Sequence, residues 1–232
     1  MKLHRIFLVL ALIVVSTPLL AAHTINWGNS VGSSLYSSTG SALDDSYTFE
    51  LGSFGSFVPT EFNMTEWLSN WKVFDRAVAP AGSGWNSGAG YFTSSSTLLG
   101  NGTSSEAVTW SLPGYTFGAG EQGYIWVYNT QTLTPNSSEW SLYTNGFDGN
   151  AANDWLFPTP SDQTGLPLDW RLDGATSSPF GAINSTQGPG DYSVDPGTLN
   201  LQTHTTTVPE PGSALLVVLS AGALLWRRRS AH

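Results

Sequence analysis

The sequence predicts an all-β fold, an antiparallel β-sandwich or a jelly-roll-like domain with one short helix. Aromatic residues make up 12% of the chain and charged residues only 11%, a balance that supplies a hydrophobic core and excludes a highly charged, disordered chain. Short apolar runs alternate with turns of Gly, Ser, Asn and Pro, at spacings typical of sandwiches and jelly rolls. The 232 residues suffice for one such domain with appendages.

The strands are indicated by apolar residues at every second position. The expected strands lie at residues 47–51, 108–112, 123–129, 140–142 and 199–201. Residues 123–129 are apolar on both faces, as a central strand would be. Residues 63–71 instead place apolar side chains at helical spacing, and we expect Asn63 as the N-cap with Glu66 completing a capping box.

The N-terminus has the parts of a cleavable signal peptide. Lys2 and Arg5 give it a positive start, about ten apolar residues follow, and small residues precede the expected cut between Ala22 and His23. A cut one residue earlier and an uncleaved signal anchor are the alternatives. About ten apolar residues are too few for a stable bilayer span, so we expect residues 1–22 to direct the chain through an export translocon and then to be removed.

The C-terminus, residues 208–232, joins an extended motif to an apolar helix and a basic cluster. The motif consists of Val208, Pro209, Glu210 and Pro211. Residues 212–226 predict a transmembrane helix about 22 Å long at 1.5 Å per residue, which is short for a hydrocarbon core of about 30 Å. A membrane stop that holds the end of the chain in the cytoplasm is expected at Arg227, Arg228 and Arg229.

This order of motif, helix and arginine cluster resembles a PEP-CTERM sorting segment. The resemblance implies recognition by a membrane enzyme, an exosortase, that cuts near Pro-Glu-Pro and releases or re-attaches the protein. The implied location is the cell surface or the extracellular matrix, after transient membrane anchoring. Such segments are sometimes labelled ice-binding, but the sequence has no regular ice-binding repeat, so that activity is not transferred. A plain transmembrane anchor is the alternative.

The part between the two ends is acidic and is expected to be extracellular. We expect a β-rich exported domain at residues 23–180 and a stalk rich in Gly, Pro and Thr at 181–207. Sixteen of the 17 acidic residues and three of the 8 basic residues lie in 23–207, which gives about thirteen net negative charges. This charge repels nucleic acid. With no cysteine, the chain has neither disulfides nor a lipoprotein anchor.

Side chains for catalysis are scarce in the predicted domain. His23 and His204 lie at its margins and cysteine is absent, so neither a catalytic triad nor a histidine-based zinc site is expected. The carboxylate pairs that remain as weak candidates for a glycosidase are Glu61 with Glu66 and Asp169 with Asp173. We predict that the protein is not an enzyme and has no catalytic residue, resident metal or cofactor.

Two ligand sites are considered. Asp148 and Asp154 bound an Asn- and Gly-rich segment whose oxygens suit calcium, but the ligand set is incomplete, so we expect at most weak binding and otherwise turn chemistry. Trp85 lies in a Gly-rich segment and is the best candidate for an exposed ring that stacks on sugar, whereas most other tryptophans are expected in the core.

Two classes of function remain open. The first is a structural or adhesive component of the cell envelope or matrix. The alternative is a carbohydrate-binding module, or more remotely a glycoside hydrolase, with envelope or matrix polysaccharide as its partner. Retention on polysaccharide distinguishes the two.

Overall fold

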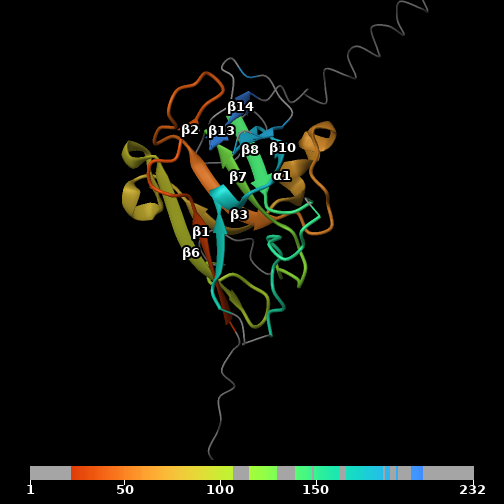
Figure 1. Cartoon of the computed structure of the whole chain (residues 1–232). Helices are drawn as coiled ribbons and strands as arrows, with labels where there is room; N and C mark the ends of the chain where they lie inside the picture. The colour runs from red at the N-terminus through yellow and green to blue at the C-terminus, as the bar shows by residue number, and fades with distance from the viewer. Residues whose placement is uncertain are drawn as a thin grey trace, which may run out of the picture.

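The computed structural model describes residues 22–106, 115–129, 139–147, 149–161, 166–184, 186–188, 192 and 200–205. As predicted, these residues form an all-β fold with mainly antiparallel sheets and one short α-helix (Figure 1). The expected signal sequence before Ala22, the strand at 108–112, the sorting motif and the helix at 212–226 lie outside the described residues. Within the described ranges, no helix has the length and apolar character needed to cross a membrane.

Fourteen strands and a few helical turns make up this part of the chain. The strands are β1 (Ala22–Gly28), β2 (Leu35–Tyr36), β3 (Thr48–Ser53), β4 (Lys72–Ala77), β5 (Trp85–Asn86), β6 (Tyr91–Leu99), β7 (Gly123–Tyr128), β8 (Glu139–Thr144), β9 (Leu168–Arg171), β10 (Ser177–Phe180), β11 (Ala182–Ile183), β12 (Thr186–Gln187), β13 (Leu201–Gln202) and β14 (His204–Thr205). The helix is α1 (Trp67–Asn70), and the 3-10 turns are η1 (Glu61–Glu66), η2 (Ala81–Ser83), η3 (Ser87–Ala89) and η4 (Leu172–Gly174).

Two large sheets set the architecture. One has six strands, in the order β10-β8-β7-β3-β4 with β14 also paired to β8, and the other has four, in the order β5-β6-β1-β9. A small third sheet runs β12-β11-β13-β2. Most neighbours are antiparallel, as predicted, but β1 pairs with β9 and β2 pairs with β13 in parallel.

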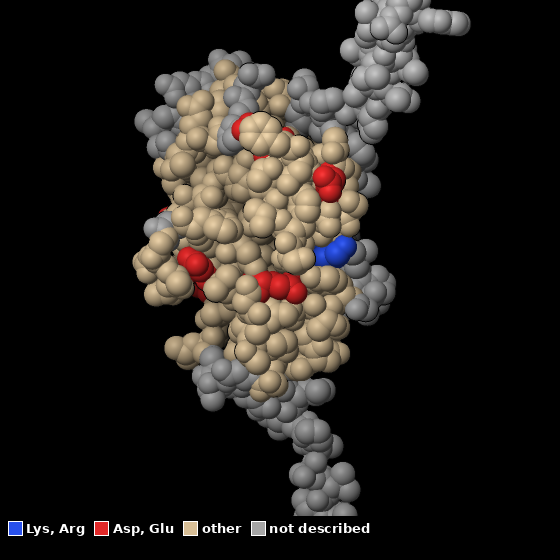
Figure 2. All heavy atoms as spheres, turned by 90° about the vertical axis from the view of Figure 1, so that its right-hand side faces the viewer, with Lys and Arg blue, Asp and Glu red and all other residues tan. Residues whose placement is uncertain are grey.

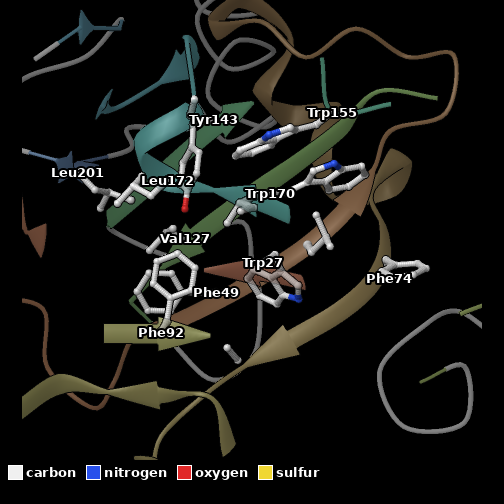
Figure 3. Packing of buried hydrophobic residues seen from close by; sticks show 14 of the residues in the cluster. Trp27, Phe49, Phe74, Phe92, Val127, Tyr143, Trp155, Trp170, Leu172 and Leu201 are labelled. Atoms are coloured by element: carbon white, nitrogen blue, oxygen red, sulfur yellow. The ribbon is translucent and has the colours of Figure 1, made fainter. Parts of the chain in front are cut away.

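The main core lies between the two large sheets. Trp27 on β1 and Phe92 on β6 face Phe49 on β3 and Val127 on β7, and all four side chains are fully buried (Figure 3). The rings of Phe49 and Phe92 stack across the interface, with centroids 4.1 Å apart. Aromatic burial on this scale supplies most of the driving force for folding.

The six-stranded sheet is also buried on its second face. Trp126 and Tyr128 alternate with the core-facing residues of β7 and pack into a second aromatic cluster with Phe54 and with Trp67 of α1. The ring of Trp67 meets that of Trp126 edge-on at 5.5 Å. The prediction that residues 123–129 form a central strand is therefore confirmed.

The predicted helix is present, but its predicted cap is wrong. Asn63 lies inside η1 with a non-helical φ of −125°, and its side-chain oxygen accepts from the backbone N–H of Thr60 at 2.8 Å. The same oxygen accepts from Nε1 of Trp67 at 2.9 Å. A six-residue 3-10 segment that is kinked at Asn63 therefore precedes α1, and the exposed Glu66 comes directly before the helix instead of completing a capping box.

The predicted stalk also needs correction, because β11, β12, β13 and β14 all lie beyond residue 180 and pair into the sheets. Ile183 and Leu201 are fully buried in the main core. Polar residues are held as well: Thr203 Oγ1 donates to Glu139 Oε2 at 2.7 Å, and Gln202 Nε2 donates to the carbonyl of Ser37 at 3.1 Å. The Thr-rich composition suggested an unpacked segment. These hydrogen bonds to residues distant in sequence offset the cost of burying its polar side chains.

One buried carboxylate ties the two large sheets together, and a second one joins the six-stranded sheet to the end of α1. Asp75 on β4 accepts from Nε1 of Trp27 on β1 at 2.7 Å and from the backbone N–H of Arg76 at 2.8 Å. Burial raises the pKa of the Asp75 carboxyl above its ordinary value, and these hydrogen bonds oppose that rise only in part. On the other face of the sheet, Glu50 pairs with Arg76 and accepts from Nε1 of Trp71 at 2.8 Å.

A chain that ends at residue 180 is expected to lose the cooperative fold, whereas a chain that ends at 207 keeps it. The shorter chain lacks Ile183 and Leu201, each worth about 1.5–3 kcal/mol of burial, and leaves one edge of β8 without β14. Domains of this size are stable by only about 5–15 kcal/mol. Thermal melts of residues 23–180 and 23–207 by circular dichroism compare the two chains. Equal melting midpoints would show that residues 181–207 are a stalk that does not contribute to the fold.

The Asp75→Asn variant is expected to change how stability depends on pH. A carboxyl whose pKa is raised by folding contributes stability that is fully present below its unfolded pKa of about 3.9 and is lost as pH rises through the folded pKa. The wild type should therefore lose stability relative to the variant above about pH 4, by up to about 1.4 kcal/mol per pH unit. Urea unfolding across this range measures the difference, and parallel curves would contradict the prediction.

Candidate functional site

An open cleft of about 520 Å³ lies where the ends of both large sheets meet. Its lining comes from three segments: Asn145 directly after β8, the loop residues 152–155, and residues 168–176 of β9, η4 and the chain before β10. About half of the lining is polar. The cleft therefore combines groups that form hydrogen bonds with an apolar base.

Two tryptophans form the base of the cleft. Trp155 and Trp170 stack with centroids 6.0 Å apart and an interplanar angle of 13°, and Figure 3 shows the rings side by side at the margin of the core. Gly123 is required beneath them, because a Cβ at this position would come within 2.6 Å of the Trp170 ring. Phe157 meets Trp170 edge-on at 5.2 Å. These contacts fix the base as a rigid surface.

The charged groups of the cleft come from β9 and η4. Asp169 and Asp173 are exposed to solvent. Arg171 lies between them in sequence, and its Nη2 donates to the carbonyl of Asn29 at 2.6 Å, which fixes the guanidinium at the end of β1. Asp154, from the opposite loop, also lines the cleft, and its Oδ1 is buried without a hydrogen-bond partner in the described part of the chain.

The chain beside the cleft is held by side-chain hydrogen bonds. Gln122 Nε2 donates to the carbonyls of Asn145 and Trp155, at 3.0 and 3.1 Å, which joins the end of β8 to the cleft loop. Thr176 Oγ1 donates to Asn145 Oδ1 at 3.1 Å. The walls are thus positioned before any ligand arrives, which lowers the entropic cost of binding.

The structure unites two of the residue sets that the sequence suggested separately. Asp169 and Asp173 share the cleft with Asp154, the last residue of the candidate calcium segment. The second predicted pair is not in this cleft: Glu61 lines a different groove, and Glu66 is exposed beside α1.

Calcium binding stays a prediction. Asp148 lies outside the described residues, and those described contain no group of three or more His, Asp or Glu side chains close enough to share an ion. Asp154, Asp169 and Asp173 therefore line one cleft without forming a compact ligand set.

The prediction of an exposed ring at Trp85 is wrong. Trp85 is fully buried, its ring lies 4.8 Å from that of Phe49, and its Nε1 donates to the carbonyl of Asp44 at 2.8 Å. The surrounding glycines permit close packing here instead of an open loop. A Cβ at Gly84, for example, would come within 2.7 Å of Ala77.

Exposed rings occur instead at positions that sequence reasoning missed. Phe62 and Phe147 are 91% and 67% exposed and line a second, apolar groove of about 330 Å³. Phe147 lies between Gly146 and Gly149 in a short Asn- and Gly-rich segment, a signal like the one that failed at Trp85. Phe62 has no distinguishing sequence context, because its exposure follows from the extra turn before α1.

Comparisons with known proteins give no match: no protein-family model, no curated protein and no solved structure is similar to this chain. The function of the cleft is therefore inferred from its geometry and chemistry.

Proposed function

We propose that the protein is an exported, adhesive component of the cell surface or extracellular matrix, and that its cleft binds polysaccharide. The observation that carries the proposal is the combination in the cleft of Asp154, Asp169, Asp173 and Arg171 with a rigid base made by two tryptophans. The core between the two large sheets supports a β-sandwich as the scaffold.

The chemistry of the cleft suits a ligand rich in hydroxyl groups. Sugar hydroxyls both donate and accept hydrogen bonds. The carboxylates of Asp154, Asp169 and Asp173 accept them, and the side-chain amide of Asn153 does both. Trp155 and Trp170 are each only 3% exposed, so they support the cleft from beneath and leave ligand contact to the polar groups around it. A pocket of mixed lining with a few placed polar groups is typical of ligand sites.

Binding accounts for the cleft better than hydrolysis does. A glycoside hydrolase needs two carboxyl groups on either side of one bond, and one of them must keep its proton in an apolar surrounding. Asp169 and Asp173 are both exposed to solvent, which does not provide such a surrounding. The negative charge of the domain adds repulsion toward nucleic acid, so neutral polysaccharide is the favoured ligand.

Export is supported by the two ends of the sequence together. The apolar N-terminal run, the small residues before His23 and the segment at 208–232 agree on one topology, with the β-domain outside the cell. The residue after the expected cut is part of the fold, because His23 pairs with Leu98 of β6. Exosortase is the proposed processing partner.

The double variant Asp169→Asn, Asp173→Asn is expected to weaken polysaccharide binding about 10- to 100-fold, because hydrogen bonds to charged groups contribute about 1.5–3 kcal/mol. Retention on insoluble cellulose, chitin and the exopolysaccharide of the source cells measures this. Glu66→Gln, an exposed acid outside the cleft, is the matched control and should bind normally. If the wild type is retained on none of these materials, the polysaccharide proposal is wrong.

Replacing Pro209, Glu210 and Pro211 by alanine is expected to leave uncut precursor in the membrane fraction. Alanine extends the helix outward and removes the extended motif, but it keeps the apolar anchor. The mass of the surface-associated protein, with and without the triple substitution, tests this. A mature wild-type protein that still carries residues 227–232 would show that the segment is only an anchor.

A further inference from the structure

We propose that the apolar groove beside the cleft is a second subsite for the same polysaccharide, in which sugar rings stack on Phe62 and Phe147. This inference rests on the proposed function and deepens it. It makes the ligand a chain of several sugars that passes from the polar cleft into the groove.

The groove is an aromatic and proline-lined hollow at the surface. Its apolar lining consists of Val58, Pro59, Phe62, Tyr124, Phe147 and Pro179. Phe62 and Phe147 expose 91% and 67% of their surface, and Val58 exposes 60%. An exposed apolar patch of this kind marks a binding surface in a soluble protein.

The backbone holds Phe147 in this exposed position. Its φ of 67° lies in the left-handed region, which a bulky residue rarely adopts and which is associated with functional positions. The preceding Gly146 donates its backbone N–H to Thr176 Oγ1 at 3.3 Å, and this bond fixes the turn. The ring of Phe147 is thus displayed at the surface by the local structure.

The groove and the cleft share one ridge. Asn145 and Thr176 line the cleft, whereas Phe147 and Ser177, close along the same two segments, line the groove. The hydrogen bond from Thr176 to Asn145 joins the two segments across the ridge. A ligand that crosses the ridge contacts both hollows, so an extended chain occupies them together whereas a single sugar does not.

Polysaccharide fits the groove better than a second copy of this domain does. Stacking on aromatic rings uses the C–H face of a sugar and needs few polar groups, and the groove has few: Thr60, Glu61 and Ser177. A second copy of this domain would bring together two bodies that each carry about thirteen negative charges. Figure 2, which shows the side where α1 lies, has mostly uncharged residues with a few isolated charges.

The test compares short and long oligosaccharides. The panel of cellulose, chitin and source-cell exopolysaccharide first identifies the polysaccharide that wild-type protein retains. Calorimetry with the disaccharide and the hexasaccharide of that polymer then measures affinity. The double variant Phe62→Ala, Phe147→Ala should bind the hexasaccharide about 10-fold more weakly, while its disaccharide affinity stays unchanged.

Two controls make the result specific. Val31→Ala removes another exposed apolar side chain, 73% exposed and outside the groove, and should change neither affinity. Phe147→Trp keeps a stacking ring and should retain hexasaccharide binding. Circular dichroism verifies that each variant is folded, as expected for changes at exposed side chains.

The outcomes separate this inference from the proposed function. If Asp169→Asn, Asp173→Asn lowers binding of both sugars but the phenylalanine variant equals the wild type, the groove is not a subsite and the cleft proposal stands. If the phenylalanine variant loses both sugars equally, the second-subsite inference is overturned. If the phenylalanine variant changes only the oligomeric state, measured by size-exclusion chromatography, the groove is a contact surface between protein copies and the subsite inference is overturned. Wild-type protein that binds no polysaccharide would overturn both proposals.

Discussion

The burial of the six-stranded sheet on both faces is the constraint on which the rest of the structure depends. Strands β3, β7 and β8 have no described residue open to solvent, so a charged side chain on them needs partners within the protein. Glu50 illustrates the consequence: Arg76 and Trp71 satisfy its carboxylate, and Trp71 ends α1. The charge in the sheet thereby fixes where the covering helix ends.

The same constraint explains why the cleft has a rigid base. Trp155 and Trp170 belong to the main core and extend it to the underside of the cleft, where Gly123 of β7 allows the Trp170 ring to lie against the sheet. The polar groups above them come from the chain beyond the strands. The sheet thus holds the apolar base in a fixed place, and the polar groups that would select a ligand lie on the loops that connect the strands.

The pattern of apolar residues predicted the central strand correctly, but it did not predict which residues near the edges of the domain are buried. Residues 123–129 are apolar at consecutive positions. This pattern indicates a central strand, because such a strand buries side chains on both faces of the sheet. Trp85 and the chain after 180 were misread because composition says nothing about partners far away in sequence. Thr203 is buried through Glu139, 64 positions earlier. The cleft likewise unites β9 with a loop that only the fold places nearby, although Asp169 and Asp173 were visible as a pair.

The ends of the domain imply an order of events under the proposed export route. His23 is only 4% exposed and paired with Leu98 in the sheet, so a peptidase that cuts beside it needs the chain before β1 has joined β6. The C-terminal side differs, because β14 ends at Thr205, before the motif that begins at Val208. Glu139, which accepts from Thr203 and from the backbone N–H of Ser38, holds this last part of the chain against the segment after β2. If the chain follows this proposed route, removal of the signal peptide would have to precede folding, whereas processing at the sorting motif would be compatible with a finished domain.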